Sequence, residues 1–259
     1  MQESPTSMKI LVLGAAGETG SRLVIAATQA GQQVSAYVRD ADKLAGRLGG
    51  QAKATNVLVG DVLDEARLAA AMSGQEAVIN AAGNAWDGDS FARTVQSTIA
   101  VAEKALGPGG RYWMFGGAGV LDVPGTNLLG VDLPGVPAVY RAHRANFETV
   151  KATQLDWSML CPGPMIPSPT GRAHEGLRLV ADTWPFAGPR FASVLPRLAL
   201  TIAFARHRGE ITITYEDAVA VILQHLERKG PFARRRVGVA LPLGVKLSKP
   251  GAGTKGNSP

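Results

Sequence analysis

The sequence predicts an α/β protein built on a doubly wound parallel sheet with small C-terminal insertions. Two observations support this prediction. Short apolar runs alternate with helical patterns along most of the chain, and glycines gather at the turn between the first run and the first helix. Strands that alternate with helices of this length form parallel sheets, because right-handed crossovers return each strand to the same direction.

The expected strands are short β-branched or apolar runs bounded by polar residues. They lie at residues 9–13, 33–38, 55–59, 77–80, 111–115 and 156–161. Helical patterns separate them, at residues 17–30, 41–48, 65–72, 90–106 and 139–153. A last unit consists of a strand at 210–214, a helix at 215–228 and a strand at 235–240. The apolar stretch 191–205 is interpreted as a buried helix or a subunit contact.

The composition is that of an ordinary globular protein, with 46% hydrophobic and 19% charged residues in a chain of 259. We expect one domain over residues 8–240, with flexible tails at 1–7 and 244–259. The longest apolar stretch is shorter than the roughly 20 residues that span a bilayer, and the N-terminal segment lacks a signal pattern. A cytoplasmic protein without membrane contact is therefore expected. Cys161 is the one cysteine and is interpreted as a core residue.

The net charge of +6 does not by itself indicate nucleic acid. Basic residues are scattered apart from the run 234–236, and anionic cofactors account for such charge equally well. We therefore expect no nucleic-acid partner. The four histidines lack the spacing of a metal site, so no metal is expected either.

A glycine-rich turn follows the first expected strand and leads into the first helix. Such a turn suits a dinucleotide, because one glycine makes the tight turn, one lets the pyrophosphate approach and one allows the helix to pack on the strand. The helix N-terminus then directs free amides at the phosphates. The residues expected to bind a cofactor here are Gly14, Ala16, Gly17, Glu18, Thr19 and Gly20.

The spacing Gly-x-x-Gly-x-x-Gly resembles that of the short-chain dehydrogenase/reductase superfamily, and further matches extend to about residue 240. Residues 59–62 (Val-Gly-Asp-Val) resemble the segment that lies against adenine in this superfamily. Residues 80–83 (Asn-Ala-Ala-Gly) resemble the segment that closes the fourth strand beside the cofactor. Residues 155–163 and 211–226 are similar to segments of the atypical branch, which includes NmrA-like regulators and biliverdin/flavin reductase-like enzymes. The resemblance implies a Rossmann-like fold and cofactor contacts at Asp61, Val62, Ala81, Ala82 and Gly83.

Arg39 follows the second expected strand, where an acidic residue binds the ribose of NAD and a basic residue accommodates the 2′-phosphate of NADP. Its planar fork suits a phosphate, which predicts NADP(H) as the cofactor, and Lys43 can add a second positive charge. The alternative is that Arg39 is a solvated residue at a strand end. Asp40 is expected to cap the helix that starts at residue 41. Glu18 argues mildly against a phosphate at the mouth of the glycine-rich turn.

Typical members of the superfamily place a serine after the fifth strand and a Tyr-x-x-x-Lys pair on the next helix. Here Gly116 and Gly117 follow the strand, and no serine or threonine comes before Thr126. These glycines either let the backbone approach the nicotinamide or substrate, or form a mere turn. Tyr140 and Arg144 fall where relatives carry the Tyr-x-x-x-Lys pair. We expect Tyr140 to be the general acid and Arg144 its charge partner; the alternative for Tyr140 is a structural or cofactor-positioning role.

Long loops at residues 116–137 and 162–196 follow the fifth and sixth expected strands. Because parallel sheets bind ligands at the carboxyl ends of their strands, these loops, and segment 170–189 in particular, are expected to bound a substrate pocket. Five aromatic residues lie in or beside such loops and form either a lid over a flat substrate or part of the core: Trp86, Phe91, Trp184, Phe186 and Phe191.

Three functions are consistent with these features. The first is an NADPH-dependent oxidoreductase that reduces a carbonyl, quinone or flavin-like small molecule, which the cofactor site and the aromatic loops favour. Its partner would be a small, flat or apolar substrate, and the protein would act as a monomer or homodimer. The second is a non-catalytic NADP-binding redox sensor of the NmrA type, which the missing serine allows. The third is a nucleotide-sugar or lactone epimerase or isomerase.

Overall fold

A computed structural model describes residues 7–50, 56–84, 87–137, 140–189 and 191–248. Most of the two expected tails, at residues 1–6 and 249–259, therefore lies outside the described residues. Trp86 lies outside them as well. Within the part of the chain that the structure describes, no helix is long and apolar enough to cross a membrane.

An eight-stranded sheet forms the centre of the molecule, in the order β3-β2-β1-β4-β5-β6-β10-β8. Neighbouring strands are parallel except for β8, which runs antiparallel to β10 at the edge. The strand order reverses between β1 and β4, because β1 pairs with β2 on one side and with β4 on the other. The strands are β1 (Lys9–Leu13), β2 (Gln33–Val38), β3 (Asn56–Val59), β4 (Ala77–Asn80), β5 (Arg111–Phe115), β6 (Asp156–Cys161), β8 (Arg178–Ala181) and β10 (Arg235–Ala240).

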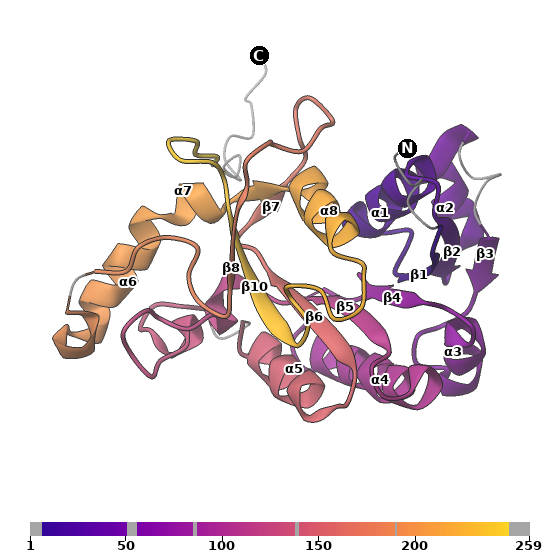
Figure 1. The fold of residues 1–259 in the computed structure, drawn as a ribbon, viewed down its shortest axis with the longest axis horizontal. Helices are drawn as coiled ribbons and strands as arrows, with labels where there is room; N and C mark the ends of the chain where they lie inside the picture. Colours follow the sequence, from indigo (N-terminus) through magenta and orange to yellow (C-terminus); the bar gives the residue numbers. More distant parts are fainter. Residues whose placement is uncertain (1–6, 51–55, 85–86, 138–139, 190, 249–259) are drawn as a thin grey trace, which may run out of the picture.

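Helices cover both faces of the sheet, as expected for a doubly wound fold. Figure 1 shows α1, α2 and α8 above the sheet and α3, α4 and α5 below it. The upper helices are α1 (Glu18–Gln29), α2 (Ala41–Leu48) and α8 (Tyr215–Gln224). The lower helices are α3 (Glu65–Met72), α4 (Asp89–Leu106) and α5 (Arg141–Ala152). The predicted fold class is thus confirmed, and the six expected strands of the parallel core are all present.

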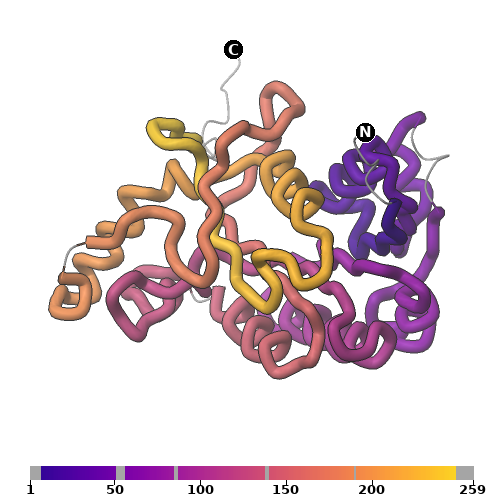
Figure 2. The backbone as a smooth tube through the Cα atoms, viewed as in Figure 1, coloured from indigo at the N-terminus to yellow at the C-terminus, as the bar shows by residue number. Residues whose placement is uncertain are grey.

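The chain between β6 and α8 forms the side of the molecule away from the N-terminal half, as the orange segment in Figure 2 shows. It contains α6 (Arg197–Arg206), α7 (Arg208–Ile211) and a small two-stranded sheet of β7 (Met165–Ile166) and β9 (Ile213–Thr214). This is the part that the sequence predicted least well. The expected strand 210–214 is half helical, and the edge strand β8 was not predicted.

The apolar stretch 191–205 is not a buried helix, so this part of the prediction was wrong. Its helix begins only after Pro196, and Leu200 is its one fully buried residue. Phe191, Val194 and Leu198 are largely exposed. Apolar residues occupy all sides of α6, so its sequence has no polar face that would have shown which side is exposed.

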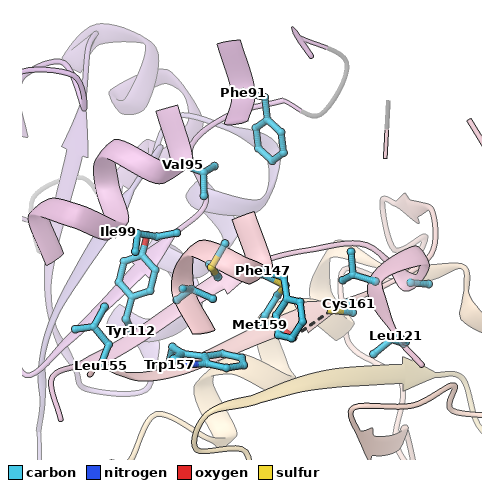
Figure 3. Close-up of a cluster of buried hydrophobic side chains, with 14 of the residues drawn as sticks. Phe91, Val95, Ile99, Tyr112, Leu121, Phe147, Leu155, Trp157, Met159 and Cys161 are labelled. Atoms are coloured by element: carbon cyan, nitrogen blue, oxygen red, sulfur yellow. Dashed lines mark hydrogen bonds between the residues drawn. The ribbon is translucent and has the colours of Figure 1, made fainter. Parts of the chain in front are cut away.

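Two apolar layers hold the helices on the sheet. In the lower layer, shown in Figure 3, Phe91, Val95 and Ile99 of α4 lie near side chains of β5 and β6. Cys161 belongs to this layer, where its thiol donates to the Met159 carbonyl at 3.4 Å. Burial raises the pKa of the Cys161 thiol, which keeps it protonated and inert. The expectation that Cys161 is a core residue is confirmed.

Candidate functional site

A cleft of about 860 Å³ opens at the carboxyl ends of β1, β4, β5 and β6. This is the edge where the strand order reverses, which is the usual ligand site of an open α/β sheet. The cleft is lined by residues 17–19, 80–84, 114–119, 135–137 and 162–165, and by Phe91, Val95, Gly130, Tyr140, His143, Thr201, Phe204, Ala205, Arg208, Ile211 and Tyr215.

The glycine-rich turn between β1 and α1 leaves no room for side chains at two of its positions. Gly14 has a φ of +70°, and a Cβ there would lie 2.7 Å from the Ala82 Cα. A Cβ on Gly20 would collide with the Gly14 carbonyl oxygen and lie 2.8 Å from the Ala15 Cα. Gly17 is the N-cap of α1 and makes no side-chain cap, so the first amides of the helix are not used by a capping side chain. The turn is therefore shaped as phosphate-binding helix N-termini are.

Glu18 is neutralised by two arginines at the mouth of this turn. Its carboxylate accepts from Arg22 at 2.8 Å and from Arg47 at 2.7 Å. Both hydrogen bonds lower the pKa of Glu18, and the one from Arg22 has the larger effect. Arg22 also pairs with Glu216 of α8 at 2.8 Å. The carboxylate that argued against a phosphate here is thus balanced by positive charge from α1 and α2.

The residues expected at the adenine end lie beyond the cleft, at the ends of β2 and β3. Arg39 is exposed, and its guanidinium pairs with none of the residues that the structure describes. Asp40 accepts from the Lys43 amide at 2.9 Å, which confirms it as the cap of α2. Asp61 accepts from the Leu63 amide with its side chain, while Val62 is partly buried against the core. Arg39 is therefore available for a ligand, and Asp61 shapes the loop after β3.

A buried hydrogen-bond network holds the segment after β4 against the cleft. Asn80 donates to the Thr98 hydroxyl at 2.7 Å and to the Tyr112 hydroxyl at 2.9 Å. Its side-chain oxygen accepts from the Ala82 amide at 3.0 Å. Ala81, Ala82 and Gly83 consequently line the cleft with a fixed backbone. The supporting role of Asn80 was not predicted, although a buried amide at the end of a strand indicates such a network.

Gly116 and Gly117 also line the cleft, but for different reasons. A Cβ on Gly116 would lie 2.7 Å from the Met159 sulfur, so this glycine makes room for the core. A Cβ on Gly117 would lie 3.3 Å from the His143 ring, so this glycine makes room for a side chain of the cleft. Neither glycine is a mere turn residue.

Tyr140 lies in the cleft and Arg144 does not. Tyr140 is the N-cap of α5, and its ring is stacked on that of His143 with centroids 6.2 Å apart. Arg144 instead donates to the Asp132 carboxylate at 2.6 Å and lies outside the cleft lining. The expectation that Arg144 is the charge partner of Tyr140 is therefore corrected, because Tyr140 precedes the helix and an acidic neighbour holds the arginine.

His143 is a residue of the cleft that the sequence reasoning missed. It is buried, its Nδ1 has no hydrogen-bond partner in the described structure, and the Phe91 ring lies edge-on to it at 5.2 Å. Burial lowers the pKa of His143 to about 4. The imidazole is therefore neutral at physiological pH. Its position three residues after Tyr140 on a helical pattern is the signal that could have revealed it.

This burial predicts a loss of stability in acid. Between about pH 6.5 and pH 4 the unfolded chain binds a proton at His143 that the folded chain does not, so stability falls as the pH falls, by up to about 1.4 kcal/mol per pH unit. Above this window the residue contributes no slope. Urea unfolding of the wild type and of His143→Gln across this pH range measures the effect. Carboxylates and His225 titrate in both proteins, so the difference between the two stability profiles reports His143. Parallel profiles for the two proteins would contradict it.

The aromatic residues divide between core and cleft. Phe91 lines the cleft, whereas Trp184 and Phe186 are buried and pack on Phe204, with ring centroids 5.1 and 6.0 Å away. Phe204 lines the cleft, so these rings support its wall from behind. Phe191 is 73% exposed and is not among the residues that line the cleft. Of the four aromatic residues that the structure describes, Phe91 alone lines the cleft, so these four do not form a lid over it.

Segment 170–189 does not line the cleft, which corrects the expectation that it bounds the substrate pocket. It returns to the sheet as β8 and places Trp184 in the core. The wall on this side comes from Pro162–Met165 and from α6 and α7. The loop after β5 does bound the cleft as expected, through residues 116–119, 130 and 135–137.

Comparison with known proteins identifies relatives of this chain. The model of an NAD(P)H-binding family matches residues 14–188. A protein from Burkholderia pseudomallei is 26% identical, with a TM-score of 0.66 over 90% of this chain and 99% of that one. A short-chain dehydrogenase/reductase from Veillonella parvula in complex with NADP is 17% identical, with a TM-score of 0.62 over 93% and 97%. The anaerobillin reductase ChuY from Escherichia coli is 19% identical, with a TM-score of 0.60 over 92% and 99%.

Proposed function

Because the chain belongs to this NAD(P)H-binding family, we propose that it is an NADPH-dependent oxidoreductase that reduces a carbonyl, quinone or flavin-like small molecule. One observation carries the proposal: a single cleft joins the phosphate-binding turn at residues 17–19 to Tyr140 and to an apolar wall that includes Phe91 and Phe204. The turn would hold the pyrophosphate, and the segments 81–83 and 116–117 would lie beside the nicotinamide. The cofactor supplies hydride when bound.

The residues of the cleft fit the binding and orientation of such a cofactor. The α1 N-terminus offers amides to the phosphates, and the Asn80 network fixes the backbone that would face the nicotinamide. Tyr140 would donate a proton to the substrate atom that becomes negative during reduction. The apolar wall would exclude water and hold a flat substrate against the nicotinamide. The likeness to ChuY, a reductase, supports the same class of reaction.

Arg39 is the basis for NADPH rather than NADH. We expect NADPH to bind at least about tenfold more tightly than NADH, because a guanidinium makes charge-assisted hydrogen bonds to a phosphate. Arg39→Asp should narrow or reverse this difference. Calorimetric titration of both cofactors measures it, with Arg228→Asp as the control, since Arg228 is an exposed arginine just after α8. Equal affinities in the wild type, or the same change in both variants, would refute the assignment.

A redox sensor without catalysis is the second candidate. It is favoured by the absence of a hydroxyl side chain among residues 116–119, where typical enzymes of the superfamily place a serine. Oxidation of NADPH followed by absorbance across quinones, flavins and carbonyls separates the two. Turnover supports the reductase, whereas tight NADPH binding without turnover on any of these substrates would support the sensor.

A further inference from the structure

The cleft has little charge for its size. Among the described residues that line it, Glu18 and Arg208 are the two that carry a formal charge. Glu18 belongs to the phosphate-binding turn and is held by Arg22 and Arg47. Arg208 enters from the other wall, at the start of α7. The positive charge of Arg208 is therefore not needed to balance the acid in the same cleft.

Arg208 also lacks a partner on its own side. The nearest acidic residue in the sequence is Glu210, and both of its carboxylate oxygens are taken. One contacts His207 Nδ1 at 2.9 Å, and the other accepts from Arg178 at 2.6 Å. Within the part of the chain that the structure describes, the Arg208 guanidinium makes no hydrogen bond or ion pair, although it is exposed at the cleft.

The surroundings of Arg208 on this wall are apolar. Phe204 and Ile211 flank it along the chain and line the same cleft. An arginine with five free donors at the edge of an apolar surface binds a planar anion in preference to a neutral group. No second cation lines the cleft among the described residues, so the charge suits one carboxylate better than a phosphate dianion.

We propose that the substrate is a flat apolar molecule bearing a carboxylate, and that the Arg208 guanidinium binds this carboxylate while the apolar body lies against Phe204. The inference rests on the proposed function in that it places the substrate in the same cleft. It adds a determinant of specificity, because a neutral analogue of the same shape would lack the charged contact.

Binding of 2-naphthoate and 2-naphthamide tests this without turnover. The two probes have the same ring system and differ mainly in charge. Titrated into the protein saturated with NADP⁺ at neutral pH, naphthoate should bind about tenfold more tightly than naphthamide. Arg208→Gln should remove this difference and leave naphthamide binding unchanged, whereas Arg208→Lys should retain part of it. Arg206→Gln is the matched control, since Arg206 lies on α6 outside the cleft lining.

Three results would overturn the inference. The first is that the wild type binds the two probes with equal affinity, and the second is that it does not bind naphthoate. The third is that Arg208→Gln loses affinity for NADPH, which would make Arg208 a cofactor residue. Thermal melting confirms that each variant is folded. Because the readout is binding, a protein that oxidises no NADPH could still show the preference, so the proposed reaction and this inference can fail separately.

Discussion

Replacing Gly20 with alanine is expected to lower NADPH affinity by about a hundredfold or more and to destabilise the fold by about 3 kcal/mol. A Cβ at this position would collide with the Gly14 carbonyl oxygen and would lie 2.8 Å from the Ala15 Cα. These are backbone atoms of the turn itself, so they cannot move aside as a flexible side chain would. The turn must open, and the α1 amides then lose their alignment with the phosphates. Calorimetric titration and thermal melting measure the two effects.

Two further variants separate packing from cofactor binding. Gly46→Ala lies on the exposed side of α2 with nothing within 4 Å of the added Cβ, so it should keep full affinity and gain up to about 1 kcal/mol of stability. In Gly17→Ala the Cβ would lie 3.2 Å from the Gly14 carbonyl oxygen, a tight contact but a looser one than at Gly20, so we expect a smaller loss of stability than in Gly20→Ala while the methyl group hinders the phosphates. Wild-type affinity in Gly20→Ala would show that the turn does not hold the cofactor.

Replacing Tyr140 with phenylalanine is expected to reduce turnover by about a hundredfold or more and to leave NADPH affinity unchanged. General-acid catalysis contributes about 10²–10⁴-fold, and the phenol is the group expected to supply it. Arg144 is held by Asp132, so Tyr140 would act without the cation that its typical relatives carry four residues later. In place of that cation, the polar ring of His143 is stacked on the Tyr140 ring.

Tyr215→Phe is the matched control, because Tyr215 also lines the cleft and its ring contacts the Arg22 guanidinium at 5.0 Å. The experiment compares kcat and KM of both variants on whichever substrate the NADPH panel reveals. A large loss confined to Tyr140→Phe supports proton donation by Tyr140. Near-wild-type turnover would show that solvent supplies the proton and that Tyr140 positions the cofactor or substrate.

The sequence was sufficient for the parallel core because β1, β2 and β4 are buried, largely apolar strands and each is followed by an amphipathic helix. It was also sufficient for the glycine-rich turn, where local backbone chemistry decides the conformation. Beyond β6 this rule ends. β8 reaches the sheet by pairing antiparallel with β10, a contact between segments about 60 residues apart, and no local pattern encodes it.

The backbone segments of the candidate site could be predicted from the sequence, but the directions of its side chains could be predicted less well. The position of Tyr140 at the cleft was predictable because its place in the sequence is typical, but Arg144 was misplaced because Asp132, from another loop, pairs with it. Arg208 and Phe204 went unnoticed because they reach the cleft through the turn from α6 to α7. Such contacts arise from tertiary packing, which the local pattern of a single sequence does not reveal.

The ion pair between Arg22 and Glu216 joins residues that are 194 positions apart. The cleft beside it is likewise assembled from distant parts of the chain, with the glycine-rich turn at residues 17–19 contributed early and the opposite wall, from Thr201 to Tyr215, contributed late. Because its lining comes from distant parts of the chain, we expect the cleft, and with it the affinity for the cofactor, to require the folded sheet. Bound cofactor then stabilises the native state alone, by about 2.7 kcal/mol at a hundredfold excess over its Kd. The concentration of NAD(P)H is thus expected to set how much of this stabilisation the protein receives.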